Sequence, residues 1–412
     1  MKLKTGILLS AMMFLQYYIW GAWYVTMGSY IDVNFFNETN LDGAKGAAYG
    51  AGAIATIISP IFVGMIADRY FSANKIMGVL HILGAVFLFY ATKMIDTNGF
   101  YWVILGYSLL YMPTIALSNS IAFGQMTDPG KQFPWIRVFG TLGWIVAGLV
   151  IAFFSFKNKD LSFLGFNNTK ITFIVAAGVS ALLGLISFIL PNTPPKASKE
   201  KSSLGSILGK DAFILFKSNA YKIFFFAAIL ICIPLSFYYS HAESFLTLTF
   251  KNNTTASMSM GQMSEALFII AIPFLFNKIG VKKMLILGMS AWVLRYVCFA
   301  YGNDASIWML YAGIILHGIC YDFFFVTGYM YTEKKAGEKI KNAAQGLFTF
   351  ATYGVGMFIG TWYSGFIANK YKTTTGTGHD WTSIWLYPAA IAGAVLIAFI
   401  FSFREKKEIS VA

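Results

Sequence analysis

The sequence predicts an all-α integral membrane protein with twelve membrane-spanning helices, arranged as two halves of six. Three observations lead to this prediction. Of the 412 residues, 57% are hydrophobic and only 12% are charged, whereas soluble domains carry about 25% charged residues. The hydrophobic residues gather in runs of about 20, the length a helix needs to cross about 30 Å of hydrocarbon. A long polar stretch interrupts these runs near the middle of the chain.

Twelve apolar runs are long enough to span a bilayer. In order they lie at roughly 5–31, 45–67, 74–95, 100–125, 134–156, 171–191, 221–248, 257–277, 283–302, 306–332, 342–369 and 383–403. The first run contains Gln16, Trp20 and Trp23 and is followed by no small-residue cleavage site. Because these residues are too polar and aromatic for a signal-peptide core, we expect the run to be retained as a helix.

The polar stretch 192–220 is rich in lysine and carries Pro194 and Pro195. We interpret it as a cytoplasmic linker between an N-terminal half, 1–191, and a C-terminal half, 221–412. Many transporters consist of two such repeats, with the substrate site near the membrane midplane where the repeats meet.

The net charge of +13 indicates orientation rather than nucleic-acid binding. With the N-terminus in the cytoplasm, 21 lysines and arginines fall on the cytoplasmic side and 8 on the other side. This bias, with an even number of spans, predicts cytoplasmic N- and C-termini. We expect a multi-pass protein of the bacterial inner membrane that is surrounded by lipid and is monomeric.

Five charged side chains lie inside the apolar runs: Arg137, Glu243, Glu265, Arg295 and Asp322. A charge at bilayer depth costs roughly 2.5 to 3.5 kcal/mol, so such residues tend to face a partner or a water-filled path. The sequence therefore predicts a polar route through the protein.

The fifth run holds Arg137, Thr141 and Trp144 at positions i, i+4 and i+7. This spacing places a cation, a hydroxyl and an aromatic plane on one helical face. We interpret the face as part of a cavity. The alternative is that Arg137 extends its guanidinium to the nearby cytoplasmic surface.

The eighth run holds Gln262 and Glu265, three residues apart and near the expected midplane. An unpaired carboxylate there would take up a proton rather than stay charged, and the amide can both donate and accept hydrogen bonds. Gln262 and Glu265 therefore both fit a substrate site. A structural hydrogen bond between helices is the alternative.

The tenth run holds His317, Tyr321 and Asp322. A membrane-embedded carboxylate with a histidine nearby is a candidate proton carrier. Alternatively, Asp322 is a permanent partner of Arg137 or Arg295, and a pair that opens on protonation would reconcile the two interpretations.

The seventh run holds Ser236, Tyr239 and Glu243 at i, i+3 and i+7, a pattern more polar than a lipid-facing helix should have. Glu243 lies near the outer end and could simply contact water. Arg295 has no partner that the sequence identifies, and His81 stands alone in the third run, where we expect it to pack.

The sequence contains no phosphate-binding glycine loop and no cluster with metal-ligand spacing. We therefore expect no cofactor and no metal, and an ion gradient as the energy source. The three cysteines all lie in apolar runs and are expected to be packing thiols rather than disulfides.

Motifs along the whole chain point to one family. They are Phe14 to Trp23, Gly64 to Arg69, Tyr111 to Thr114, Phe133 to Gly143, Ser264 to Ile269, Ala291 to Arg295, Asp322 to Phe324 and Ala344 to Gly346. With these motifs, the chain resembles the nucleoside:proton symporter family of the major facilitator superfamily, the bacterial nucleoside permeases. The resemblance implies the major facilitator fold, with twelve helices in two pseudo-symmetric halves, and the uptake of nucleosides together with protons. We expect no enzymatic activity, because no catalytic nucleophile, metal set or base pair stands out in the sequence.

The resemblance also implies substrate contacts. Arg137, Thr141, Gln262 and Glu265 match the family in residue type. Trp144 replaces another aromatic residue of the enteric members.

Four further positions differ from the enteric members. Ser236 and Tyr239 replace amide side chains, and His317 and Tyr321 replace Tyr and Phe. Asp322 matches the acidic residue implied in proton coupling, in which we expect Arg137 and Glu265 to take part.

Other functions remain compatible with the residues themselves. A proton-coupled symporter could carry another small polar solute such as a sugar. A membrane receptor or scaffold would not transport at all, although it would have no need of carboxylates buried in the membrane.

Overall fold

A computed structural model describes residues 3–62, 71–127, 129–156, 169–194, 210–250, 254–373 and 378–404. The prediction of an all-α protein is confirmed, because these residues form helices and, apart from one isolated bridge between Lys372 and His379, no strand. The α-helices are α1 (Leu3–Trp23), α2 (Met27–Asn34), α3 (Leu41–Phe62), α4 (Ala73–Ala91), α5 (Thr97–Gly124), α6 (Pro129–Phe156), α7 (Lys170–Ser187), α9 (Asn219–Phe250), α10 (Thr254–Tyr301), α11 (Ile307–Tyr321), α12 (Thr327–Thr349), α13 (Met357–Lys370) and α14 (Trp381–Ser402). Between them lie the 3-10 segments η3 (Lys210–Lys217) and η5 (Asp304–Ser306) and the π-helical segments η6 (Asp322–Val326) and η7 (Phe350–Gly356).

The helices overlap every one of the predicted apolar runs. Within the described residues, eight helical stretches are long and apolar enough to cross a membrane, so the count of twelve stays a prediction. The first run differs from expectation, because it forms two helices, α1 and α2, that meet at Tyr24–Thr26.

Two helices contain turns that the sequence placed between spans. Gly280 in α10 and Gly337 in α12 have φ angles of 79° and 63°. Glycine adopts positive φ without the steric cost that a Cβ would bring. Each glycine therefore ends one helix and starts the next. The predicted Gly64–Arg69 motif and most of the predicted linker lie outside the described residues.

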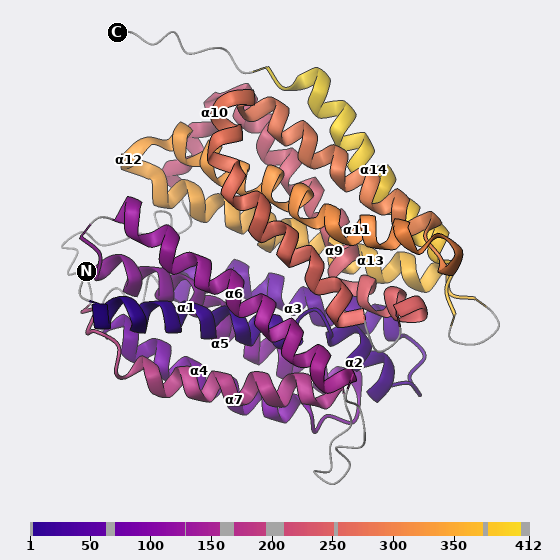
Figure 1. Cartoon of the computed structure of the whole chain (residues 1–412), viewed down its shortest axis with the longest axis horizontal. Helices are drawn as coiled ribbons and strands as arrows, with labels where there is room; N and C mark the ends of the chain where they lie inside the picture. The colour runs from indigo at the N-terminus through magenta and orange to yellow at the C-terminus, as the bar shows by residue number, and fades with distance from the viewer. Residues whose placement is uncertain are drawn as a thin grey trace.

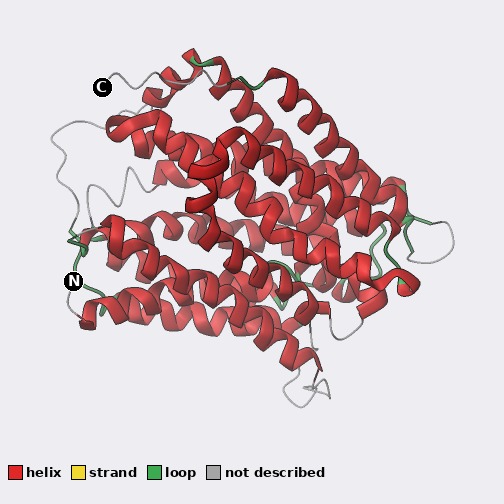
Figure 2. Cartoon of the chain, turned by 45° about the horizontal axis from the view of Figure 1, so that its top comes forward, coloured by secondary structure: helices red, strands yellow, loops and turns green. Residues whose placement is uncertain are grey.

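The helices form two groups, α1–α7 and α9–α14, which lie beside each other in Figure 1. Figure 2 shows the connecting loops at the ends of the helices. One cluster of buried apolar side chains lies within the first group, and a second lies almost entirely within the other. The groups meet where α3 packs against α13, α6 against α10, and α2 against α9.

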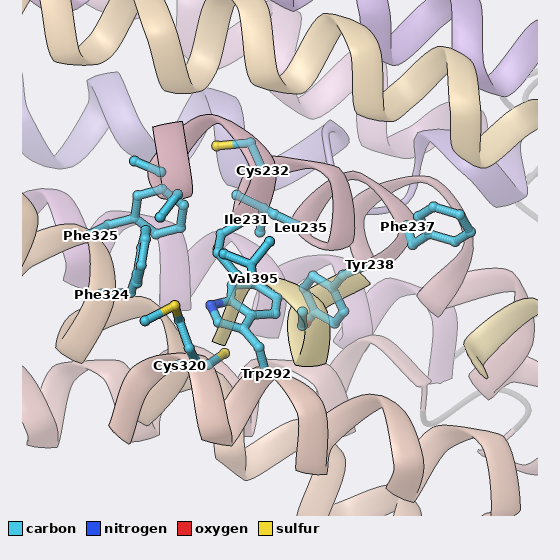
Figure 3. Close-up of a cluster of buried hydrophobic side chains, with 14 of the residues drawn as sticks. Ile231, Cys232, Leu235, Phe237, Tyr238, Trp292, Cys320, Phe324, Phe325 and Val395 are labelled. Atoms are coloured by element: carbon cyan, nitrogen blue, oxygen red, sulfur yellow. The ribbon is translucent and has the colours of Figure 1, made fainter. Parts of the chain in front are cut away.

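Aromatic and aliphatic side chains from several helices fill the core of the second group. Figure 3 shows Cys232 and Cys320 among these side chains, close to Leu235, Trp292 and Phe324. All three cysteines of the chain are buried and free, so the prediction of packing thiols is confirmed.

Candidate functional site

Two aromatic side chains pack against the cores of both helix groups. Trp144 on α6 and Tyr239 on α9 each contact both clusters of buried apolar residues. The Trp144 ring lies edge-on to Trp20, with ring centroids 5.5 Å apart, and the Tyr239 ring lies edge-on to Tyr24 at 5.2 Å. These four rings mark the junction between the groups.

A close approach of α1 and α6 positions Trp144. A Cβ atom added at Gly143 would collide with the Phe14 carbonyl. Glycine therefore allows the two backbones to touch, as small residues do between membrane helices. Trp144, the residue after Gly143, then contacts the ring of Trp20.

Arg137 and Thr141 lie on the same α6 face as Trp144, because α6 is continuous over all three. Both side chains are half-buried. The Arg137 guanidinium carbon lies 4.2 Å from the ring centroid of Tyr17, a cation–π contact. This face of α6 therefore offers a positive charge, a hydroxyl and an indole ring.

Glu265 is positioned by a tight contact between α10 and α11. The Ser264 hydroxyl donates to the Ile315 carbonyl at 2.7 Å and accepts from the Gly318 amide at 3.0 Å. As the residue after Ser264, Glu265 lies beside α11, with its Oε2 3.8 Å from His317 Nε2. The Glu265 side chain is 21% exposed, so it remains accessible. Gln262, one turn earlier, is buried.

Arg295 has the partner that the sequence did not identify. Its guanidinium Nη1 lies 2.8 Å from His317 Nδ1, and its Cζ lies 3.7 Å from the ring centroid of Tyr238. The Tyr238 and His317 rings stack at 5.2 Å. Sequence spacing could not reveal this contact, because it joins α9, α10 and α11.

Asp322 is fully buried at the first position of η6. Single π-helical turns are frequent at functional sites. Neither carboxylate oxygen has a hydrogen-bond partner among the described residues, and neither pairs with Arg137 or Arg295. The alternative of a permanent ion pair is therefore wrong for this conformation. Beside Asp322, the Tyr321 and Tyr353 hydroxyls share a hydrogen bond.

Two predicted polar residues of α9 lie in tighter surroundings than expected. The Ser236 hydroxyl donates to the Cys232 carbonyl at 2.8 Å and lies against Met357 of α13. Glu243 is buried, with only 8% of the residue exposed, rather than in contact with water.

The sequence predicts that His81 only packs, but the structure shows that it also takes part in hydrogen bonds. Its Nε2 lies 2.8 Å from Gln16 Oε1, and the Gln16 amide donates to Thr114 Oγ1 at 2.8 Å. Ser180 Oγ lies 3.3 Å from His81 Nδ1. This buried network ties α1, α4, α5 and α7 together.

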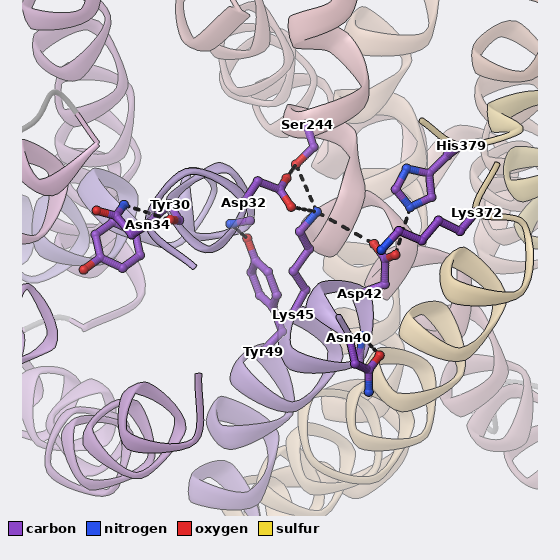
Figure 4. A network of polar contacts seen from close by, with 12 residues as sticks. Tyr30, Asp32, Asn34, Asn40, Asp42, Lys45, Tyr49, Ser244, Lys372 and His379 are labelled. Atoms are coloured by element: carbon purple, nitrogen blue, oxygen red, sulfur yellow. Dashed lines mark hydrogen bonds and ion pairs between the residues drawn. The ribbon is translucent and has the colours of Figure 1, made fainter. Parts of the chain in front are cut away.

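A second network that sequence reasoning missed joins the two helix groups. Lys45 of α3 pairs with Asp32 of α2 at 2.7 Å, and Asp32 accepts from Ser244 of α9 at 2.8 Å. Asp42 of α3 lies 2.8 Å from Nε2 of His379, which precedes α14 (Figure 4). The α2 end of the bundle lies far from the N-terminus in Figure 1. The network therefore links the groups at that end.

Two helix groups with polar side chains at their junction are the architecture of a secondary transporter. Among the residues described, no group of three or more His, Cys, Asp or Glu side chains could hold a metal ion. The profile of the nucleoside H+ symporter family matches residues 1–408, and this chain belongs to that family. It is a transporter and not an enzyme.

Individual relatives agree with this assignment. The protein YegT of Escherichia coli (strain K12) is 40% identical over 98% of this chain and 95% of its own length. The xanthosine permease of the same organism is 36% identical over 96% of this chain and 95% of its own. The crystal structure of the nucleoside transporter NupG matches with a TM-score of 0.85 at 31% identity, over 98% of this chain and all of the other.

Proposed function

We propose that this chain imports nucleosides together with protons by alternating access, with the substrate held where the two helix groups meet. The observation that carries the proposal is the junction itself. Trp144 and Tyr239 contact both cores there. The Tyr238 ring stacks on His317, and His317 lies beside Glu265. A ligand bound among these side chains would contact both groups at once.

The side chains suit a flat base on a polyhydroxylated ring. Aromatic planes such as Trp144 stack on bases. Glu265, Gln262, Arg137 and Thr141 supply a carboxylate, an amide, a cation and a hydroxyl for ribose and base edges.

Tyr239, His317, Tyr321 and Ser236 complete the proposed contacts. The Ser236 hydroxyl would have to leave the Cys232 carbonyl before it could bind a substrate.

Asp322 is the proposed coupling group. A buried carboxylate without a partner is costly when charged, so it favours binding a proton. If the opposite conformation gives this carboxylate a partner or water, its proton affinity differs between the two conformations. That difference couples proton movement to the conformational change. Glu265 and Arg137, from opposite helix groups, are proposed to respond to the same change.

The placement in the cell is part of the proposal. The excess of lysine and arginine on one side supports cytoplasmic termini in a bacterial inner membrane. We propose that the chain consists of two halves, 1–191 and 221–412, joined by the linker 192–220, because each helix group has its own buried core. We also propose that the protein is a monomer.

Uptake by cells tests the function. Labelled uridine is offered to a transport-deficient bacterial host that expresses the chain, with unlabelled nucleosides and sugars as competitors. We expect accumulation that nucleosides compete for and that a protonophore abolishes. Competition by a sugar alone would favour the other symporter, and the absence of any accumulation would contradict transport.

A further inference from the structure

A buried arginine with no carboxylate partner among the described residues lies beside the proposed substrate site. Arg295 is fully buried. Its Nη1 lies 2.8 Å from His317 Nδ1 and 3.5 Å from the Cys320 sulfur, while its Cζ lies 3.7 Å from the Tyr238 ring centroid. Its Nε and Nη2 atoms have no hydrogen-bond partner among the described residues. The contact with the imidazole is therefore its shortest polar interaction.

This contact determines the position of the His317 proton. A guanidinium is always protonated in proteins, has five N–H donors and cannot accept a hydrogen bond. At 2.8 Å, His317 Nδ1 must therefore accept from Arg295 with its lone pair. A neutral imidazole that accepts at Nδ1 carries its proton on Nε2.

The protonated nitrogen faces Glu265. His317 Nε2 lies 3.8 Å from Glu265 Oε2, which is too long for a direct hydrogen bond. Gly261 of α10 lies against the histidine, since a Cβ there would be 3.2 Å from that of His317. The N–H donor of His317 and the carboxylate acceptor of Glu265 lie side by side.

The surroundings oppose a second proton on the ring. The titratable and charged groups around His317 are Arg295 and Glu265 from α10, Tyr238 from α9, and Cys320 and Tyr321 from its own helix. A proton on Nδ1 would face an Arg295 donor at 2.8 Å, with two positive charges in contact. With Nδ1 engaged as an acceptor, His317 is suited to donate a hydrogen bond from Nε2.

We infer that Arg295 is a positioning residue that holds His317 as an Nε2–H donor beside the Glu265 carboxylate, so that together they recognise two neighbouring ligand atoms, one accepting and one donating. The part of this inference that concerns ligand recognition rests on the proposed function. Two parts of a nucleoside have this chemistry. One is a pair of vicinal ribose hydroxyls, and the other is the carbonyl and N–H edge of a base such as uracil.

The tautomer is tested on the purified, ligand-free protein by 15N NMR with labelled histidine. The chain has four histidines, so the signals of His317 are those lost in His317→Gln. We expect an unprotonated Nδ1 and a protonated Nε2. In Arg295→Met the two tautomers should mix, whereas Arg295→Lys keeps a donor and should preserve more of the original signal. A protonated Nδ1 in the wild-type protein would overturn the inference, whatever the variants do.

Ligand recognition is tested by titration with uridine. His317→Phe keeps a stacking ring but lacks the N–H, and we expect roughly tenfold weaker binding, the effect of one net hydrogen bond. His317→Gln keeps an N–H donor and should lose less. Equal losses in the two variants would contradict a donor role.

Analogues then identify the recognised atoms. If ribose provides them, 2′-deoxyuridine or 3′-deoxyuridine binds weakly to wild type but loses little further in His317→Phe, because the two changes remove the same interaction. If the base provides them, 2-thiouridine or 4-thiouridine behaves in this way, because sulfur replaces a carbonyl oxygen that would accept from Nε2–H. Fully additive losses for all of these analogues would overturn recognition by the pair.

The outcomes separate the inference from the proposed function. Without any uridine binding the proposed function fails, while the NMR result still decides the tautomer. A protonated Nδ1 together with normal uridine binding means that the inference alone is wrong.

Discussion

The network that joins Asp42 to His379 predicts a measurable shift between conformations. The His379 and Asp42 side chains are only 11% and 2% exposed, and Nε2 lies 2.8 Å from Oδ2. This bond crosses between helix groups, because Asp42 belongs to α3 and His379 precedes α14. A state in which this end of the bundle opens must break it.

The proposed perturbation is His379→Phe. Phenylalanine keeps a ring against Trp381, whose centroid lies 4.9 Å away, but it cannot donate to the carboxylate. A hydrogen bond to a charged group contributes about 1.5 to 3 kcal/mol. Because Asp42 keeps Lys45 at 3.9 Å, we expect the lower end of this range. Since about 1.4 kcal/mol is a factor of ten, the ratio of open to closed protein should rise about tenfold.

Spin-label distances provide the assay. Phe36 and Leu248 are 67% and 62% exposed and belong to different groups, near the α2 end. Labels on Phe36→Cys and Leu248→Cys, in a background without the natural cysteines, should show a longer distance component in His379→Phe.

The matched control is the substitution Asp380→Asn, at the residue that follows His379. The Asp380 carboxylate accepts from Ser383 at the start of its own helix, from the backbone amide at 3.1 Å and from the hydroxyl at 2.6 Å. The control should leave the distances unchanged. Unchanged distances in His379→Phe, or an equal change in both variants, would refute the reasoning.

Three further predictions concern the proposed substrate and proton sites. Glu265→Gln should weaken uridine binding at least about tenfold, because it removes a charged acceptor; titration within about twofold of wild type would contradict this. Trp144→Ala should weaken binding by about 1 to 3 kcal/mol, and Trp144→Phe by less, because stacking needs an aromatic plane. Equal losses in the titration would mean that Trp144 only packs. Asp322→Asn should abolish protonophore-sensitive uptake in cells yet keep counterflow in proteoliposomes, since it mimics the protonated carboxylate. Nucleoside accumulation against a gradient by this variant would rule out Asp322 as the coupling group.

Apolar run length was enough to locate the helices. Each predicted run overlaps at least one helix, because a segment in lipid must satisfy its own backbone hydrogen bonds. The predicted first helix differs from the structure because the chain breaks locally within that run. The first run breaks at Tyr24–Thr26 into α1 and α2, a break that hydrophobicity alone does not record.

The composition of the candidate site also followed from the sequence, since charged residues inside apolar runs are few and conspicuous. Their partners did not follow. One interpretation of the sequence paired Asp322 with Arg137 or Arg295, yet Asp322 has no hydrogen-bond partner among the described residues. Ser236 turned out to bond its own helix and to lie against α13.

The sequence by itself determined a helical membrane transporter and the polar side chains that it carries in its spans. Helical periodicity specifies which residues share a face, because it depends only on neighbours along the chain. Only the tertiary structure decided which faces meet. The Gly318–Ser264 contact brings Glu265 beside His317, and Arg295 reaches the same ring from the part of α10 that follows Gly280. Such contacts depend on backbone separations between helices, which small residues set and which no single-helix pattern contains.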